Sequence, residues 1–136
     1  MPYITKQFKF CAAHRYWNDN WSKEKNKEIF GKDIHIHGHN YSLFITIYGP
    51  IDPSSGFIIN LKDLNKLVNE KIINVMDHTQ IEKNISWFVD KQPSTENMVK
   101  FIWEQIEPYI LKPAKLFCVK LQETPTIFTE YFGKED

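Results

Sequence analysis

Apolar and polar side chains alternate along residues 3–14, and the last of the alternate positions that carry the apolar residues is a histidine. The residues of that parity are Ile4, Phe8, Phe10, Ala12 and His14. The alternation predicts a half-buried strand with a histidine at the end of its apolar face. Residues 37–48, HGHNYSLFITIY, are rich in β-branched and aromatic side chains and predict a second strand. Residues 16–32, between the two strands, predict a long loop, and the charged stretch WSKEKNK (21–27) within it is typical of a solvated surface.

Two later segments carry apolar residues at helical spacing, over residues 61–76 and 95–110. Asn60 and Ser94 stand just before them and can cap their first turns. The stretch between the two predicted helices, from residue 77 to 93, has no such periodicity and predicts a loop.

Short strands near residues 115–123 and 126–131 complete the order ββααββ. Two apolar helix faces need one sheet face to cover them, so we expect an α+β fold with a four-stranded antiparallel sheet and two helices on one face. We expect a single domain over residues 1–136. The two open edges of such a sheet are commonly removed by pairing with other subunits, so we also expect a homo-oligomer.

Composition narrows the classes of function. Lysine plus arginine and aspartate plus glutamate number 17 each, so no net charge attracts the chain to nucleic acid or to an anionic membrane. The apolar runs are too short to span a bilayer, and MPYITKQFKF has no apolar signal segment. The two cysteines, Cys11 and Cys118, are few for a secreted disulfide scaffold. We therefore expect a cytoplasmic protein with free thiols.

Three of the five histidines lie in the run HIHGH, at positions 35, 37 and 39. Alternate residues of a strand share a face, so His37 and His39 can present two imidazoles side by side. His14, at the end of the other strand, can add a third. Three histidines with an open fourth position are typical of a catalytic zinc site. Two alternatives remain open: any of these residues can be an ordinary surface or core histidine, and His35 has the parity to compete as a ligand.

Longer motifs occur in a fixed order: FCAAH (10–14), HGHNY (37–41), MDHTQI (76–81), PSTEN (93–97) and QETPTIFTEY (122–131). In this combination the sequence resembles the family of 6-pyruvoyltetrahydropterin synthase and 6-carboxytetrahydropterin synthase over nearly the whole chain. The resemblance implies the tunnelling fold, whose ββααββ unit closes a β-barrel by oligomerisation into trimers. It also implies that two trimers stack as a hexamer.

The resemblance further implies zinc as the cofactor, with His14, His37 and His39 as its ligands. It implies 7,8-dihydroneopterin triphosphate as the substrate of a zinc-dependent carbon–oxygen lyase. The product would be 6-pyruvoyl- or 6-carboxytetrahydropterin, or a pterin whose side chain has been cleaved. In such chemistry the metal holds side-chain oxygens and eases removal of a nearby proton.

Further site residues follow from the same motifs. Asp77 and His78 match an Asp-His pair that serves with a cysteine in proton transfer. We expect them at a helix end or in a loop, because adjacent helical residues do not face each other. Glu123 matches the acid that anchors the pterin ring, since one carboxylate can accept from a ring N–H and its neighbouring amino group. Thr95 and Glu96 match positions near the ring pocket. Each of these residues also has an ordinary explanation as a polar helix end or strand end.

The sequence departs from the family where a catalytic cysteine usually stands, a few residues before HGH. Asp33 occupies that position in GKDIHIHGH. Neither cysteine replaces it by sequence, because Cys118 is distant and Cys11 has the strand parity opposite to that of His14. Asp33 is our candidate base, with His35 as the alternative. Some relatives use a glutamate in this region and cleave the side chain to 6-hydroxymethyl-dihydropterin.

The missing cysteine keeps a second hypothesis open. The chain can be a catalytically silent homologue that still binds a pterin or a metal. The presence of Asp77, His78 and Glu123 favours the enzyme over the silent homologue.

Overall fold

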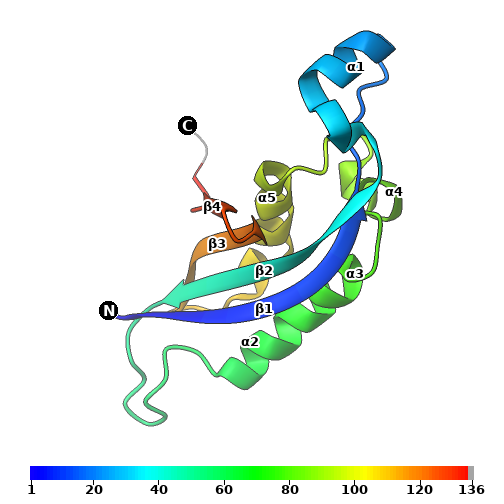
Figure 1. Cartoon of the computed structure of the whole chain (residues 1–136). Coiled ribbons are helices and arrows are strands. Elements are labelled where there is room, and N and C mark those ends of the chain that lie inside the picture. Colours follow the sequence, from blue (N-terminus) through cyan, green and yellow to red (C-terminus); the bar gives the residue numbers. More distant parts are fainter. Residues whose placement is uncertain (135–136) are drawn as a thin grey trace.

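The computed structural model describes residues 1–134. Within these residues the sheet has four strands in the order β1-β2-β3-β4, and each strand pairs antiparallel with the next. The strands are β1 (Tyr3–His14), β2 (His37–Tyr48), β3 (Lys115–Thr124) and β4 (Ile127–Tyr131). Figure 1 shows β1 and β2 as a long curved ribbon pair. The predicted first two strands agree with β1 and β2 residue for residue.

The predicted helices are both present. The first comprises α2 (Leu61–Val68), a π-helical turn (Asn69–Ile73) and α3 (Asn74–Met76). The second comprises α5 (Thr95–Ile106) and a 3₁₀ turn (Glu107–Tyr109). None of the helices in residues 1–134 is long and apolar enough to cross a membrane.

Both predicted caps form. The side-chain oxygen of Asn60 accepts from the backbone N–H of Lys62 at 3.0 Å, and that of Ser94 accepts from the N–H of Asn97 at 3.2 Å. Each bond satisfies a first-turn N–H that has no partner inside its helix. The capping residues Asn60 and Ser94 therefore set where the two main helices begin.

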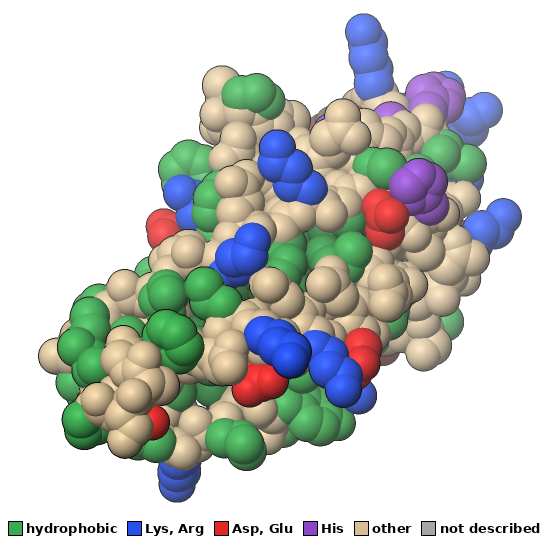
Figure 2. All heavy atoms as spheres, turned by 90° about the horizontal axis from the view of Figure 1, so that it is seen from below, with side chains coloured by type: hydrophobic (Ala, Val, Ile, Leu, Met, Phe, Trp, Pro, Cys, Tyr) green, Lys and Arg blue, Asp and Glu red, His purple; other side chains and the backbone are tan. Residues whose placement is uncertain are grey.

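The core lies between one face of the sheet and the helices, so the expected α+β arrangement is confirmed. The inward parity of β2 supplies Leu43, Ile45 and Ile47, which are fully buried against the apolar stripes of α2 and α5. The other face of the sheet carries partly exposed aromatic rings. Among them are Tyr3 and Phe117, which pack edge to face with 4.6 Å between their ring centroids. Figure 2 shows hydrophobic side chains gathered at one end of the molecule and histidines near the other.

The segment predicted as a loop over residues 16–32 contains a helix, α1 (Lys23–Phe30), followed by a 3₁₀ turn (Gly31–Ile34). The helix has no apolar stripe, so its periodicity gave no signal. Asn26 is fully buried and holds it in place, accepting the N–H of Asn18 at 2.7 Å and donating to the carbonyl oxygen of Asn18 at 3.0 Å. Figure 1 shows α1 standing out from the body of the molecule.

The predicted loop over residues 77–93 also contains short helical elements. These are α4 (Ile81–Asn84) and a 3₁₀ turn (Ser86–Phe88). They were missed because each is about one turn long, too short for a periodic pattern to appear.

Candidate functional site

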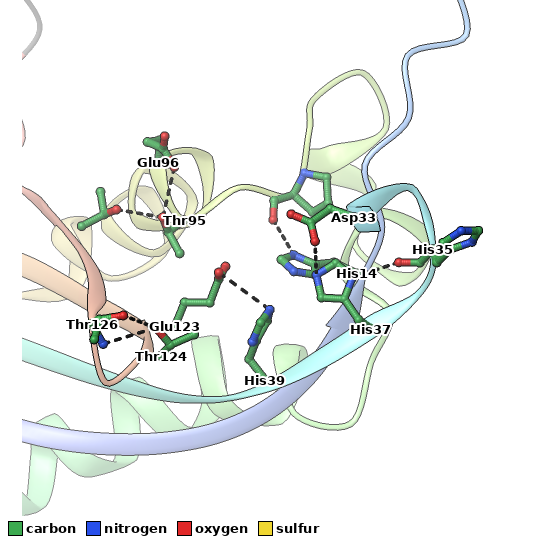
Figure 3. Close-up of polar contacts among 12 residues, drawn as sticks. His14, Asp33, His35, His37, His39, Thr95, Glu96, Glu123, Thr124 and Thr126 are labelled. Atoms are coloured by element: carbon green, nitrogen blue, oxygen red, sulfur yellow. Dashed lines mark hydrogen bonds and ion pairs between the residues drawn. The ribbon is translucent and has the colours of Figure 1, made fainter. Parts of the chain in front are cut away.

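His14, His37 and His39 meet at one end of the β1–β2 ladder. His14 pairs with His37 across the ladder, and His39 pairs with the buried Ala12. Paired residues point to the same face of a sheet, so all three imidazoles face the helix side. Their candidate ligand nitrogens lie within 4.8 Å of one another. Figure 3 shows the His14 and His37 rings together, with His39 beside them.

Backbone carbonyls fix the tautomers of two of these rings. His14 donates from Nδ1 to the carbonyl of Pro93 at 2.8 Å, and His37 donates from Nδ1 to the carbonyl of His35 at 2.8 Å. A carbonyl only accepts, so the proton sits on Nδ1 and Nε2 keeps a lone pair. This is the arrangement in which outer partners orient metal-binding histidines.

Two of the free nitrogens have no hydrogen-bond partner in the part of the chain that the structure describes. Among the described residues, Nε2 of His14 and Nε2 of His39 are buried without a hydrogen bond. Burial lowers the pKa of His14, and His37 and His39 nearby lower it further. A neutral imidazole with a buried, unpaired lone pair suits a metal ion, because the ion supplies the missing partner. The three histidines therefore fit a nitrogen-ligated metal.

His35 is not part of this cluster. Its side chain is exposed, and Figure 3 shows its ring pointing away from the other three. Only its carbonyl takes part, as the acceptor for His37. The backbones of β1 and β2 approach closely at Gly38, because a Cβ there would lie 3.2 Å from the carbonyl oxygen of Ala12.

Two carboxylates border the histidines. Asp33 Oδ1 lies 3.7 Å from His37 Nε2, and Glu123 Oε1 lies 3.7 Å from His39 Nε2. The Asp33 side chain is 58% exposed, whereas that of Glu123 is 15% exposed. Figure 3 shows both carboxylates directed at the cluster from different elements, the 3₁₀ turn after α1 and the end of β3.

Thr95 and Glu96 lie at the start of α5. The Thr95 hydroxyl is buried, donates to Glu96 at 3.0 Å and also contacts the Thr129 hydroxyl of β4 at 2.8 Å. Thr95 therefore ties α5 to the sheet, and Glu96 stays exposed.

Two tyrosines of the site were missed by the sequence reasoning. Burial raises the pKa of Tyr16, and the negative charges of Glu123, Glu96 and Asp33 raise it further. The Tyr41 hydroxyl is buried without a partner among the described residues, and burial followed by Glu123 raises its pKa. Tyr41 lies on the same face of its strand as His37 and His39 in HGHNY, and this shared parity could have identified it as a residue of the site.

Asp77 and His78 lie elsewhere, at the end of α3, as expected for adjacent residues whose side chains meet. His78 Nδ1 donates to Asp77 Oδ2 at 2.8 Å. The pair contacts Cys11, whose Sγ lies 3.8 Å from His78 Nε2. Cys11 has the parity opposite to that of His14, so this group lies on the other face of the sheet. Within one chain, the structure does not bring Asp77 and His78 to the three histidines.

Comparison with known proteins gives a consistent result. The family model described as 6-pyruvoyl tetrahydropterin synthase matches residues 3–134. A 6-pyruvoyl tetrahydrobiopterin synthase of Drosophila melanogaster is 35% identical over 98% of this chain and 80% of its own length. A 6-carboxy-5,6,7,8-tetrahydropterin synthase of Bacillus subtilis is 31% identical over 80% of this chain and 76% of its own.

The fold agrees with these matches. The solved structure of Caenorhabditis elegans 6-pyruvoyl tetrahydropterin synthase has a TM-score of 0.89 to this chain, with 31% identity and 98% of both chains covered. A match of this extent in both sequence and structure means that the chain belongs to the 6-pyruvoyl tetrahydropterin synthase family.

Proposed function

We propose that this enzyme is a zinc-dependent lyase that acts on 7,8-dihydroneopterin triphosphate. Its product would be 6-pyruvoyl- or 6-carboxytetrahydropterin, or a pterin with a cleaved side chain. The observation that carries the proposal is the convergence of three imidazoles in which the Nε2 atoms of His14 and His39 are buried without a hydrogen-bond partner among the described residues.

His14, His37 and His39 would hold the zinc ion through their free nitrogens. A set of three histidines leaves a fourth position for substrate, which is typical of catalytic zinc. Bound zinc would polarise the side-chain oxygens of the substrate and ease removal of a proton from the adjacent carbon. The thiol of Cys11 is on the opposite sheet face and does not enlarge this ligand set.

Glu123 would anchor the pterin ring. Its carboxylate is mostly buried and lies beside His39, so a ring bound to it would have its side chain near the histidine cluster. Two oxygens of one carboxylate can accept from a ring N–H and the neighbouring amino group together. Thr95 and Glu96 would border the same ring, since Thr95 holds the start of α5 against Thr129, on the strand that pairs with the Glu123 end of β3.

Asp33 would accept a proton from the substrate side chain. Its distance of 3.7 Å to His37 supports this role, because the substrate side chain would lie at the histidines. Its exposed carboxylate can reach a bound ligand without moving the sheet. The family's cysteine is replaced in this chain by a group that is still able to act as a base.

Asp77 and His78 would serve a substrate held by another copy of the chain. They lie on the sheet face opposite to the histidines, so a substrate at this chain's own metal site does not meet them. An assembly that brings the two faces together removes this difficulty, and we propose a homo-hexamer made of two trimers. The free thiols favour a reducing compartment, and we expect the enzyme in the cytoplasm.

Turnover tests the proposal directly. The zinc-loaded protein is incubated with 7,8-dihydroneopterin triphosphate, and the products are identified by mass spectrometry. Loss of triphosphate with formation of a new pterin is the expected result, and the mass of that pterin identifies the product. Binding of the pterin without turnover would instead indicate a silent homologue.

A further inference from the structure

Gln92 and Pro93 are neighbours in the segment before α5, and they contact the end of β1 and the chain just after it. The carbonyl oxygen of Pro93 accepts the Nδ1 proton of His14 at 2.8 Å. The side-chain amide of Gln92 pairs with the backbone of Trp17. Its Nε2 donates to the Trp17 carbonyl at 2.8 Å, and its Oε1 accepts the Trp17 N–H at 3.2 Å. Because the two bonds run in opposite directions, they fix the orientation of the amide as well as its position.

Asn97, in the first turn of α5, holds the residues on both sides of Pro93. Its side-chain Nδ2 donates to the carbonyl of Gln92 at 2.9 Å, and its backbone N–H donates to Ser94 Oγ at 3.2 Å. Pro93 itself is buried, and its ring restricts the backbone torsion φ. The carbonyl that orients His14 therefore belongs to a short, rigid segment that is anchored on α5.

His14 differs in this respect from His37. The Nδ1 proton of His37 goes to the carbonyl of His35, which is only two residues away in the same segment. The Nδ1 proton of His14 goes to a carbonyl that is 79 positions away. The orientation of the His14 ring thus requires two distant segments to stay together, and the bonds between Gln92 and Trp17 join those same two segments.

We propose that Gln92 is a positioning residue of the histidine cluster. Its amide, supported by Asn97, holds the Pro93 carbonyl against His14, so that the proton stays on Nδ1 and the lone pair of Nε2 faces the other two histidines. The consequence for zinc affinity rests on the proposed function, whereas the orientation of the ring does not. Gln92 would act through Pro93 and would contact neither the ion nor the substrate.

Nuclear magnetic resonance of the metal-free protein tests the orientation. With ¹⁵N-labelled histidine, the ring nitrogen shifts show which nitrogen carries the proton, and at about pH 8 an imidazole with the usual pKa of about 6.5 is neutral. Wild-type His14 should be protonated on Nδ1. Gln92→Met keeps the length of the side chain and removes both bonds to Trp17. In this variant His14 should become a mixture of both tautomers, while His37 keeps its wild-type shifts.

Gln105→Met, the same substitution near the end of α5, is the matched control and should leave His14 unchanged. If Gln92→Met does not fold, Asn97→Asp carries the same test, because it removes the donor to the Gln92 carbonyl and keeps the backbone N–H that bonds Ser94. His14 protonated only on Nδ1 in the folded variant would overturn the proposal. Equal changes at His14 and His37 would overturn it as well, since they would indicate a general loss of structure.

Zinc affinity tests the consequence. In competition with a chromophoric chelator, Gln92→Met should bind zinc about tenfold more weakly than the wild type, because outer partners of metal-binding histidines have effects of this order. Gln105→Met should bind it as tightly as the wild type. Unchanged affinity in Gln92→Met would disconnect Gln92 from the metal. If the wild type binds no zinc, the proposed function and this consequence fail together, and the His14 tautomer still decides whether Gln92 positions the ring.

Discussion

The carboxylate of Asp33 lies 3.7 Å from Nε2 of His37, the nitrogen that the hydrogen bond to the His35 carbonyl leaves free. The two residues are four apart, and the 3₁₀ turn between α1 and β2 brings the carboxylate back toward the strand. A base at this distance would act beside any substrate side chain that the histidines hold.

Asp33→Asn is expected to abolish turnover while zinc stays bound, because the amide keeps the shape of the side chain and cannot accept the proton. Asp33→Cys restores the residue type that relatives carry and should recover turnover or redirect it toward their usual product. Asp19→Asn, at an exposed carboxylate in the turn between β1 and α1, is the control and should behave as the wild type. Turnover of Asp33→Asn at the wild-type rate would leave His78 or His35 as the candidate base.

Zinc content should depend on His37 and not on His35. His37→Ala removes one of three converging nitrogens, and metal analysis after dialysis should show less than one zinc per chain. His35→Ala keeps the backbone carbonyl that orients His37, so its zinc content should equal that of the wild type. Stoichiometric zinc in His37→Ala would show that the ligand set is wrong.

Glu123→Gln should weaken pterin binding. The substitution places an amide N–H against the donors of the ring, and the loss of a charged hydrogen bond is worth about 1–3 kcal/mol. Titration calorimetry with the pterin measures this change. Glu130→Gln alters an exposed carboxylate of β4 and should leave the affinity unchanged. Equal affinity in both variants would exclude Glu123 from the ring site.

The protein should sediment at about six times its chain mass of 16.2 kDa. In the described residues the sheet is open along β4 and along β1 before Cys11, where the chain after α3 begins to cover the edge. Open edges are commonly covered by further strands. Ile127→Lys places a charge at the start of β4 and should shift the mass downward. Val89→Lys, at a residue outside both edge strands, should not. A wild-type monomer at micromolar concentration would contradict the proposed assembly.

The sequence by itself determined the strands and the main helices. Strand alternation has a period of two, so the parity of His14, His37 and His39 was enough to place them on the apolar face of adjacent strands. Asn60 and Ser94 fixed the starts of the helices through local hydrogen bonds. Helix α1 was not predicted from the sequence, because a buried asparagine holds it in place and it has no apolar stripe.

Only the tertiary structure decided which residues from distant segments meet. Glu123 reaches His39 because β3 pairs with β2, and Cys11 reaches His78 because the chain after α3 binds the edge of β1. Cys11 and His78, for example, are 67 positions apart in the sequence. Local periodicity carries no information on such distances, since packing and long-range backbone pairing set them.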